Sequence, residues 1–349
     1  MKIGLKKYAM ILLSAFLLIL LAACGNSATP TPEEENTEPS NSQEENQEAN
    51  EEEAPAEKFK IGVTQIVAHD SLDAAFEGFK KAIEDAGLEV EWDIQSAHGE
   101  PSNNPTIATN LVNSGVDLIF ANSTGSAQSV ASETEDIPIV FTSVTDAVGA
   151  ELVESMESPG GNVTGTIDMH PDSISDTLKF LSEELGAKSV GMVFNAGEQN
   201  SRAQVDNVKK LIDELGLDLK VEEASVSTSA EVKQATESLI GQIDSLYIIT
   251  DNTVVSALQS VVDVANTNKL PMMVGEFDSV KNGGLAAYGF EYFDIGYEAG
   301  EMAVKILKDG VKPADIPVQV PQNLKLVINK ETAETIDLEI KDEWNAELE

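Results

Sequence analysis

Short apolar runs alternate with amphipathic stretches along the chain from residue 58 onward. Between the first two runs, the apolar positions of residues 71–86 recur at the spacing of an amphipathic helix. Strands of β-branched residues that alternate with helices are typical of βαβ units and parallel sheets. The strand runs of this first series are FKIGV (59–63), LEVEW (88–92), DLIFA (117–121) and IPIVF (137–141).

A second series with the same order begins near residue 189. Gly62 and Gly191 stand 129 residues apart, and so do Gly87 and Gly216, which indicates an internal repeat. The sequence pattern that all βαβ units share would also produce such matches. Both interpretations predict an α/β protein with two doubly wound parallel-sheet lobes. The second series comprises strands at 189–194, 217–224, 245–250 and 270–275 and a helix at 201–215.

Two glycine-rich segments predict that the chain crosses between the lobes on several hinge strands: GGNVTGTID (160–168), which is also β-branched, and the similarly glycine-rich GGLAAYGF (283–290). Ligands of open α/β sheets bind outside the carboxyl ends of the strands, so a cleft between the lobes is the expected site. We expect lobe one to comprise residues 58–166 and 284–312, and lobe two to comprise residues 167–283 and 313–349.

The first residues read as a targeting signal. Lys2, Lys6 and Lys7 precede an apolar run of 17 residues that ends at Cys24. The ending LAAC resembles the lipobox of bacterial lipoproteins, and the only Cys of the chain stands there. An uncleaved membrane helix is the alternative, although the run is short against the roughly 20 residues that span a bilayer. We expect a signal peptide over 1–23 and a lipid on Cys24 that anchors the protein to the outer face of the cell membrane.

Residues 25–57 contain eleven Glu and four Pro but no Lys or Arg. A segment with so little apolar surface cannot offset the entropy of ordering. We therefore expect residues 24–57 to be a lipid-anchored Cys followed by a disordered acidic linker.

Charge and rare residues exclude several classes of protein. The chain has 61 acidic and 22 basic residues, a net charge of −39, which argues against nucleic acid as a partner. A single Cys excludes disulfides and paired-cysteine metal or redox sites. The three His residues do not form a ligand pattern, so we expect no metal and no cofactor.

In lobe one, the loop NSTGSAQ (122–128) follows a strand and opens a helix. Ser123, Thr124 and Ser126 flank Gly125 there. Free backbone N–H groups, the helix dipole and hydroxyl groups together suit a carboxylate. Ordinary capping of the helix would need only one of these hydroxyls.

In lobe two, the corresponding loops carry amides and acids. Asn200 and Ser201 stand at a helix start, and Asp251 and Asn252 directly follow a strand. A carboxylate at that place can meet a ligand ammonium, because a buried charge needs a partner of opposite sign. Asp251 could instead cap the next helix. Asp278 is a second candidate for the ammonium.

Four further residues stand in the strand-end loops. Gln65 follows the first strand and can both donate and accept hydrogen bonds, so we include it in the ligand site. His69, Asp146 and Phe277 stand in similar loops, and whether they touch a ligand stays open. An ordinary turn would account for Asp146, and solvent exposure for His69.

Four segments of the chain are specific enough to suggest a family: GVTQIVAHDSLDAAFEGF, IPIVFTSVTDAVGAELVESMESPGGNVTG, NAGEQNS and TDNTVVSAL. On these segments, residues 58–340 resemble the substrate-binding proteins of ABC transporters with the type I periplasmic-binding-protein fold. The resemblance is to the subfamily associated with tryptophan and other aromatic amino acids. It implies a monomer that binds an α-amino acid in the interlobe cleft by hinge closure and delivers it to ABC permease and ATPase subunits.

Three other functions are alternatives to this one. A sugar- or nucleoside-binding protein shares this fold but favours stacked aromatics, and the cleft loops are poor in aromatics apart from Phe277. A receptor ectodomain would need a downstream membrane helix. An enzyme would need a catalytic motif such as a nucleophile elbow, and the sequence contains none that we identify. We therefore expect no catalysis.

Overall fold

The computed structural model describes residues 58–349. The predicted signal peptide, Cys24 and the acidic linker lie outside the described residues. Among residues 58–349, no helix combines the length and apolar character needed to cross a membrane.

Lobe one is built on a five-stranded sheet in which every pair of neighbouring strands is parallel. The strand order β2-β1-β3-β4-β5 places the first strand in the interior, as a doubly wound sheet requires. The strands are β1 (Lys58–Gln65), β2 (Glu89–Ser96), β3 (Leu118–Asn122), β4 (Ile139–Val144) and β5 (Val163–Ile167).

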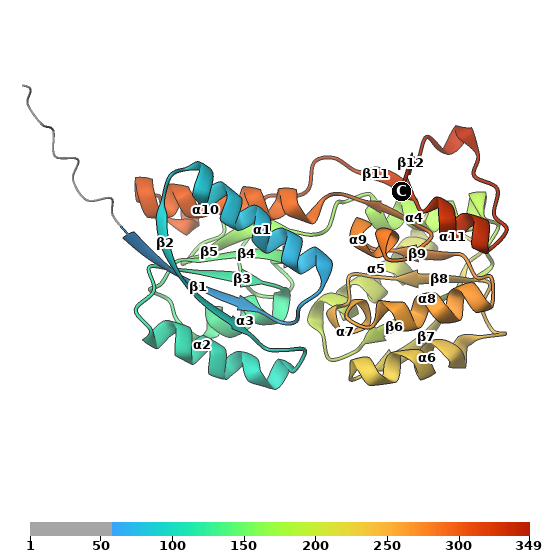
Figure 1. The fold of residues 1–349 in the computed structure, drawn as a ribbon, viewed down its shortest axis with the longest axis horizontal. Coiled ribbons are helices and arrows are strands. Elements are labelled where there is room, and N and C mark those ends of the chain that lie inside the picture. Colours follow the sequence, from blue (N-terminus) through green and yellow to red (C-terminus); the bar gives the residue numbers. More distant parts are fainter. Residues whose placement is uncertain (1–57) are drawn as a thin grey trace, which may run out of the picture. The chain divides into compact units, whose positions relative to one another are not determined.

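Helices cover both faces of this sheet because its strands are apolar on both sides. Along β3, Phe120 packs in one core with α1 (Asp70–Asp85) and α10 (Tyr292–Asp309), whereas Ile119 packs in the opposite core. The second core contains α2 (Asn104–Asn113) and α3 (Thr124–Glu133). Figure 1 shows α10, the red-orange helix from late in the chain, beside the blue α1.

Glycines allow α1 and α10 to pack at very short range. A Cβ atom on Gly296 would lie 1.8 Å from the carbonyl oxygen of Ala75, and one on Gly78 would lie 2.0 Å from the carbonyl oxygen of Phe293. Both neighbours are backbone atoms, which cannot move aside as a side chain can. Gly296 and Gly78 therefore fix how closely the two helices approach.

Lobe two is built on a seven-stranded sheet with the order β12-β11-β10-β9-β8-β6-β7. Its neighbouring strands are parallel except for β10 and β11, which are antiparallel. The strands are β6 (Ser189–Asn195), β7 (Lys220–Val226), β8 (Ser245–Ile248), β9 (Met272–Val274), β10 (Ala286–Gly289), β11 (Lys325–Ile328) and β12 (Glu347–Leu348).

Helices on both faces of this sheet enclose two further apolar cores. The helices are α4 (Ser173–Lys179), α5 (Gln199–Leu215), α6 (Val232–Leu239), α7 (Asn252–Val255), α8 (Leu258–Thr267), α9 (Phe277–Lys281) and α11 (Lys330–Thr335). Short helical turns complete the described chain: η1 (Pro101–Asn103), η2 (Phe180–Glu184), η3 (Ser229–Glu231), η4 (Pro313–Asp315) and η5 (Asp342–Trp344).

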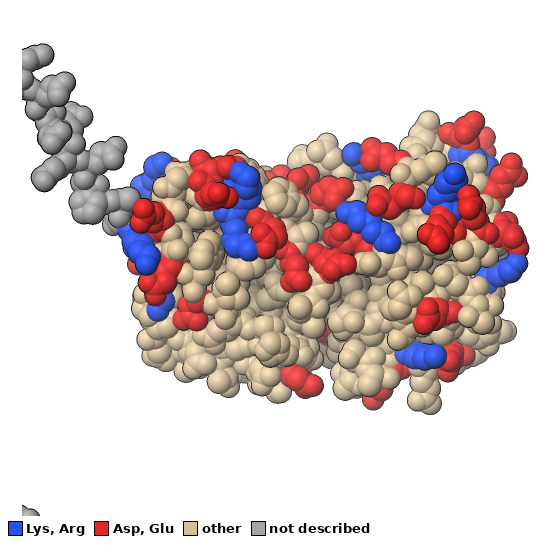
Figure 2. All heavy atoms as spheres, viewed as in Figure 1, with Lys and Arg blue, Asp and Glu red and all other residues tan. Residues whose placement is uncertain are grey.

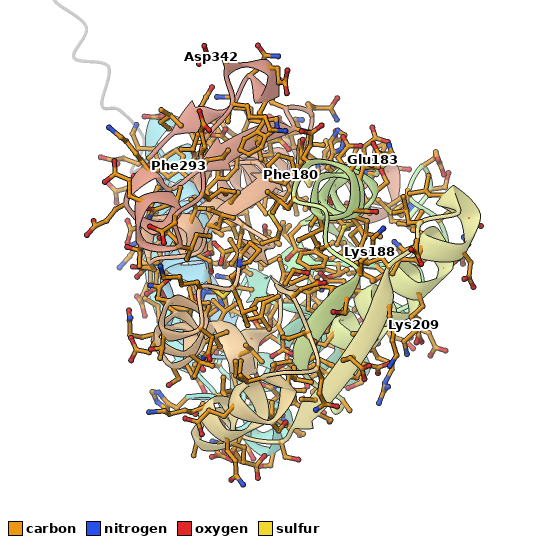
Figure 3. The ribbon with its side chains drawn as sticks, turned by 90° about the vertical axis from the view of Figure 1, so that its right-hand side faces the viewer. Phe180, Glu183, Lys188, Lys209, Phe293 and Asp342 are labelled. Carbon is orange, nitrogen blue, oxygen red and sulfur yellow. The ribbon has the colours of Figure 1, made fainter. Side chains whose placement is uncertain are left out.

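The C-terminal segment closes lobe two by packing on η2. The Trp344 ring meets the buried Phe180 ring edge-on at 4.9 Å, and its Nε1 donates to Glu184 at 2.7 Å. Figure 3 labels Phe180 in the middle of the view and Lys188 and Lys209 further out, where both lysines pair with acidic neighbours. The last residues are therefore an integral part of this lobe.

The crossovers differ in position from the sequence-based boundaries. We expected residue 284 to begin the return to lobe one, but β10 pairs with β9 and β11 in the sheet of lobe two. The chain crosses to lobe one after Gly289 and there forms α10. The next crossover also comes later than residue 313, because Ile316 packs in a lobe-one core and Gln319 bridges to Thr166.

The expected architecture of two doubly wound lobes is confirmed. Charged side chains gather in the upper part of the view in Figure 2, over α1, α10 and the C-terminal elements, with few on the lower face of lobe one. Residues 101–132, which include α2, contain a single charged residue, Asp117. Exposed ion pairs such as Lys58–Glu91 contribute at most about 1 kcal/mol each, so the apolar cores hold the fold together.

Candidate functional site

The carboxyl ends of strands from both sheets meet at one nearly closed cavity. Its volume is about 10 Å³, measured as the space open to the centre of a water molecule, which is room for about one water-sized group. Lobe two supplies most of the lining. The lining residues are His69, Leu72, Ser143, Asp168, Asn200, Thr250, Asp251, Asn252, Val255, Glu276 and Tyr292.

Three carboxylates line this cavity and all are buried: Asp168 is 6% exposed, Asp251 0% and Glu276 2%. Of the described residues that line it, none is Lys or Arg. Buried carboxylates are costly unless hydrogen bonds or opposite charges compensate them. The contacts of each carboxylate therefore decide which of them can receive a ligand.

Asp168 follows β5, where the chain leaves lobe one. Its Oδ1 accepts a hydrogen bond from Thr145 Oγ1 at 3.1 Å, and its Oδ2 accepts one from Tyr292 Oη at 2.8 Å. Burial raises the pKa of Asp168 to about 6 against these two stabilising bonds. Because Tyr292 begins α10, the bond also joins two of the chain crossovers.

Asp251 is the N-cap of α7. Its Oδ1 accepts from the Val254 N–H at 2.8 Å, and its Oδ2 accepts from the Asn195 N–H at 2.6 Å and from Ser201 Oγ at 2.7 Å. Burial, and then the charge of Glu198, raise the pKa of Asp251 to about 7. Asp251 therefore caps α7, which was the alternative role that the sequence indicated. Contact of Asp251 with a ligand stays a prediction.

Glu198 organises the loop beside Asp251. It accepts hydrogen bonds from the backbone N–H groups and the side chains of Asn252 and Thr253, at 2.7–3.2 Å. Asn200, which lines the cavity, donates to Glu198 at 3.3 Å and to the carbonyl of Thr250 at 3.1 Å. The predicted lobe-two residues are thus brought together, but mostly by bonds to one another.

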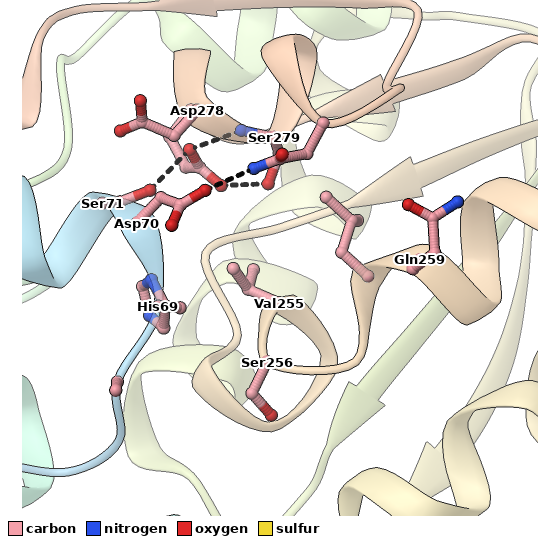
Figure 4. Close-up of a pocket in the computed structure, with 12 residues that line it drawn as sticks. His69, Asp70, Ser71, Val255, Ser256, Gln259, Asp278 and Ser279 are labelled. Carbon is pink, nitrogen blue, oxygen red and sulfur yellow. Dashed lines mark hydrogen bonds between the residues drawn. The ribbon is translucent and has the colours of Figure 1, made fainter.

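Glu276 caps α9 and also reaches across the cleft. Its Oε2 accepts from the Ser279 N–H at 2.9 Å and from Ser71 Oγ of lobe one at 2.7 Å, and the Ser279 hydroxyl donates to its Oε1. Figure 4 shows Ser71 facing α9. Glu276 is therefore a direct link between the lobes.

Two further side-chain contacts join the same segment of lobe one to lobe two. Asn282 Nδ2 donates to Asp70 at 2.7 Å (Figure 4), and His69 Nε2 lies 3.5 Å from Asn252 Oδ1. Burial lowers the pKa of His69, which favours the neutral ring. Around these contacts runs a groove of about 260 Å³ that shares His69, Val255 and Glu276 with the cavity.

Lobe one, in contrast, leaves polar atoms unpaired at its strand ends. Within residues 58–349, seven buried side-chain atoms have no hydrogen-bond partner, and five of them belong to lobe one. Natively buried polar groups are almost always paired, so such a cluster calls for an explanation. The seven atoms are Asn104 Oδ1, Asn122 Oδ1, Thr124 Oγ1, Ser126 Oγ, Ser143 Oγ, Gln199 Oε1 and Thr250 Oγ1.

The predicted loop in lobe one has the geometry of a helix N-terminus. Ser123 is the N-cap of α3, with a strained φ of 120°, and its Oγ accepts from the Ser126 N–H at 3.4 Å. Gly125 leaves space beside the Asn104 amide. Helix α3 contacts α5 of lobe two. The hydroxyls of Thr124 and Ser126 are therefore buried at a helix start near the lobe boundary, in excess of what capping uses.

Gln65 supports the site from behind. Its Oε1 accepts from Asn122 Nδ2 at 2.9 Å, while its own amide donates to Asp73 at 2.7 Å and to the Val67 carbonyl at 2.9 Å. Gln65 is not among the residues that line the cavity. The structure therefore places it as a neighbour that orients Asn122.

Like Gln65, several other candidates are not among the residues that line the cavity: Ser123, Thr124, Gly125, Ser126, Ser201, Asp278, Asp146 and Phe277. The last three have other contacts. Asp278 lines the outer groove and pairs with Lys281 at 3.0 Å. Asp146 accepts from the Gly149 N–H at 2.8 Å, as an ordinary turn requires. Phe277 is buried in a lobe-two core.

Sequence reasoning missed several residues that line the cavity: Ser143, Asp168, Thr250, Glu276 and Tyr292. Four of them stand at the end of a predicted strand or hinge segment or within two residues of it, so the strand-end rule could have found them. Tyr292 stands at a helix start after a crossover, and no pattern in the sequence marks it. In the part of the chain that the structure describes, no group of three or more His, Cys, Asp or Glu is placed to hold a metal ion.

Comparison with known proteins identifies relatives of this chain. A family model described as ABC transporter substrate binding protein matches residues 60–347. A tyrosine-binding protein of Clostridioides difficile (strain R20291) is 42% identical over 284 residues, which cover 80% of this chain and 81% of that protein.

Two solved structures have the same fold. One is an ABC domain from Streptococcus pneumoniae in complex with L-Trp, with a TM-score of 0.78 at 31% identity, covering 84% of this chain and 100% of that one. The other is the ligand-free, open structure of a substrate-binding protein with adhesive properties from Clostridium difficile. It has a TM-score of 0.62 at 38% identity and covers 83% of this chain and 99% of that one.

Proposed function

This chain belongs to the family of ABC transporter substrate-binding proteins, and on that premise we propose that it binds a free aromatic α-amino acid between its lobes. Proteins of this family are extracytoplasmic and work with a permease and an ATPase. The observation that carries the choice of ligand is the charge of the cavity: three buried carboxylates with no basic residue among the described lining residues. Such a site favours a ligand that carries an ammonium group.

The strand ends of lobe one supply the complementary half of a zwitterion site. The backbone N–H groups at the start of α3 and the unpaired hydroxyls of Thr124 and Ser126 suit a carboxylate. A neutral sugar would need neither charge. Two relatives of more than 30% identity support the same choice: one is named a tyrosine-binding protein, and the other was solved in complex with L-Trp.

We propose that binding proceeds by hinge closure. The described conformation is more similar to the tryptophan complex than to the open, ligand-free structure, although the open one is closer in sequence. The cavity of about 10 Å³ is far too small for an aromatic amino acid, so the lobes must separate for entry. Closure then stabilises the form that contacts the ligand from both lobes.

Calorimetry with L-tyrosine, L-tryptophan, L-phenylalanine and a set of neutral sugars and nucleosides tests the proposal. We expect saturable binding of at least one amino acid and a smaller radius of gyration in solution scattering when it is bound. Binding of a sugar or nucleoside and of no amino acid would refute it.

A variant sharpens this test. Thr124→Val keeps the shape of the side chain and removes its hydroxyl. It should weaken L-tyrosine about tenfold and leave tyramine, which lacks the carboxylate, unchanged. Equal weakening of both ligands would contradict a carboxylate site at the start of α3.

We also propose that the protein is anchored by a lipid on Cys24, on the basis of its sequence alone. Two acyl chains on one residue give stable membrane attachment. Mass spectrometry of the membrane fraction should find a diacylated N-terminal Cys. Unchanged membrane retention of Cys24→Ser would favour the uncleaved helix instead.

A further inference from the structure

We propose that Asp168, with the hydroxyls of Ser143 and Thr250, forms the subsite for the ammonium group of the ligand. The inference rests on the proposed function, since it assigns one end of the amino acid. It differs from the assignment of Asp251 that the sequence favoured.

The hydrogen bonds of the three buried carboxylates distinguish them. Asp251 accepts two backbone N–H groups and a hydroxyl, and Glu276 accepts one N–H and two hydroxyls. Asp168 accepts only two hydroxyls from other side chains, those of Thr145 and Tyr292. Asp168 therefore has the fewest donors from other residues among the carboxylates in the cavity, which leaves its oxygens the most room to accept a cation.

The other two carboxylates, those of Asp251 and Glu276, each cap a helix. Asp251 holds the start of α7, and Glu276 holds the start of α9 and the Ser71 hydroxyl of the other lobe. Rotation of either side chain toward a ligand would release backbone N–H groups that are now capped. Asp168 caps no helix, so its carboxylate can take a new partner without such a loss.

Two unpaired hydroxyls line the same cavity as Asp168. Ser143 Oγ and Thr250 Oγ1 are buried and have no partner within the described chain, and they come from lobe one and lobe two respectively. An ammonium group has three N–H donors and no acceptor. One carboxylate oxygen and two hydroxyl oxygens would satisfy all three donors, which explains why these hydroxyls stay unpaired.

The neighbourhood of Ser143 supports a functional reading. Ser143 has a φ of 56°, in the left-handed region that a residue other than glycine rarely adopts, and the β4–β5 register shifts between Phe141 and Val144. The Asp168 N–H then bonds to the Val144 carbonyl at 3.0 Å. This irregularity places Ser143 among the cavity-lining residues beside the end of β5.

The test combines variants of the protein with variants of the ligand. The dissociation constants of L-tyrosine and of 3-(4-hydroxyphenyl)propionate, which lacks only the amino group, are measured by calorimetry, with competition for weak binding. In the parent protein, tyrosine should bind about 30- to 1000-fold more tightly than the analogue. In Asp168→Asn this ratio should collapse to within about threefold of one, because tyrosine alone is weakened.

Matched variants control for structural damage. Asp251→Asn makes the same chemical change in the same cavity, and its ratio should stay near that of the parent. Thr250→Val should lower the ratio about tenfold. If Asp168→Asn does not fold, as judged by circular dichroism and its thermal transition, Asp168→Ser serves as the neutral variant.

Two results would overturn the assignment: a parental ratio in a folded neutral variant at position 168, or a collapse of the ratio in Asp251→Asn instead. Failure of the parent to bind any aromatic amino acid would refute the proposed function itself. A parent that binds tyrosine with an unchanged ratio in Asp168→Asn would refute only the role of Asp168.

Discussion

The strand ends of lobe one and lobe two differ in how their polar side chains are satisfied. In lobe one, Asn122, Thr124 and Ser126 each keep a buried atom without a partner. In lobe two, Asp251 and Glu198 accept hydrogen bonds from most of their neighbours, and only Thr250 Oγ1 and Gln199 Oε1 are buried without a partner within the described residues of that lobe. Both regions are rich in Asn, Ser and Thr, so composition does not explain the difference.

This difference indicates that the strand ends of the two lobes have different roles in binding. Unpaired groups reduce stability and increase affinity for whatever pairs them, whereas a satisfied network is rigid and presents a fixed surface. Lobe one therefore holds the groups that gain most from a ligand. Lobe two is a preorganised partner that closes on it. Changes at the paired groups of lobe two should affect stability, whereas changes at the unpaired groups of lobe one, and at Thr250 in lobe two, should affect affinity.

The largest expected effect is on Asp251. Asp251→Ala leaves the N–H groups of Asn195 and Val254 and the Ser201 hydroxyl without an acceptor. We expect the free energy of unfolding to fall by about 3 kcal/mol, measured by urea denaturation. The matched control is Asp263→Ala, on the exposed side of α8. A loss for Asp251→Ala no larger than for the control would contradict the network.

The second prediction concerns pH. Burial raises the pKa of Asp251 from 3.8 to about 7, so the folded protein binds a proton that the unfolded chain has lost. Its stabilising contribution is complete below pH 4 and is lost as the pH rises through 7. Between pH 5 and 6.5, the stability of the parent relative to Asp251→Asn should fall by at most about 1.4 kcal/mol per pH unit. A difference independent of pH would mean that Asp251 is ionised throughout.

Two serines offer a matched comparison of the lobes. Ser201 and Ser126 are both 0% exposed, but the Ser201 hydroxyl donates to Asp251 at 2.7 Å and that of Ser126 has no partner. Ser201→Ala should cost about 1–2 kcal/mol in thermal or urea unfolding, and Ser126→Ala should cost less than about 0.5 kcal/mol. Equal losses would show that the two lobes are not different in this respect.

The smallest effect is expected at the contact between the lobes. Ser71→Ala removes the hydroxyl that donates to Glu276 across the cleft. The closed form should lose roughly 0.5–1.5 kcal/mol, which weakens L-tyrosine about three- to tenfold and raises the radius of gyration of the ligand-free protein. Ser132→Ala, on the exposed part of α3, is the control. An unchanged radius with unchanged affinity would show that the contact does not favour closure.

The sequence predicted the fold well because period and apolarity are local properties. Each strand and helix expected from a run of residues is present within a few positions, from β1 to β10. The sheet that β10 joins was predicted wrongly. The segments that contain β5 and β10 are both glycine-rich, but β10 pairs with β11, which lies more than 30 residues later in the chain. The composition of a run does not state which sheet it joins.

The site was predicted less completely for a related reason. Asp251 and Asp168 both follow a strand, but only the folded chain brings three donors to Asp251 and leaves Asp168 with two. Likewise, the sequence indicates that Gln65 can bind a ligand, but in the folded chain its Oε1 accepts a hydrogen bond from Asn122. Which groups remain unpaired depends on neighbours distant in sequence, and no pattern along one chain reports it.

The close glycine contacts of α10 with α1 have a consequence for the order in which the protein is made. Tyr297 and Asp85, which touch across these helices, are separated by 212 residues. Until α10 has left the ribosome, the core around Phe79 and Phe120 lacks Met302 and its neighbours and exposes apolar surface to water. Lobe two lies entirely between these two helices apart from its C-terminal strands. The lobe whose translation begins first therefore cannot be completed until the chain is almost finished.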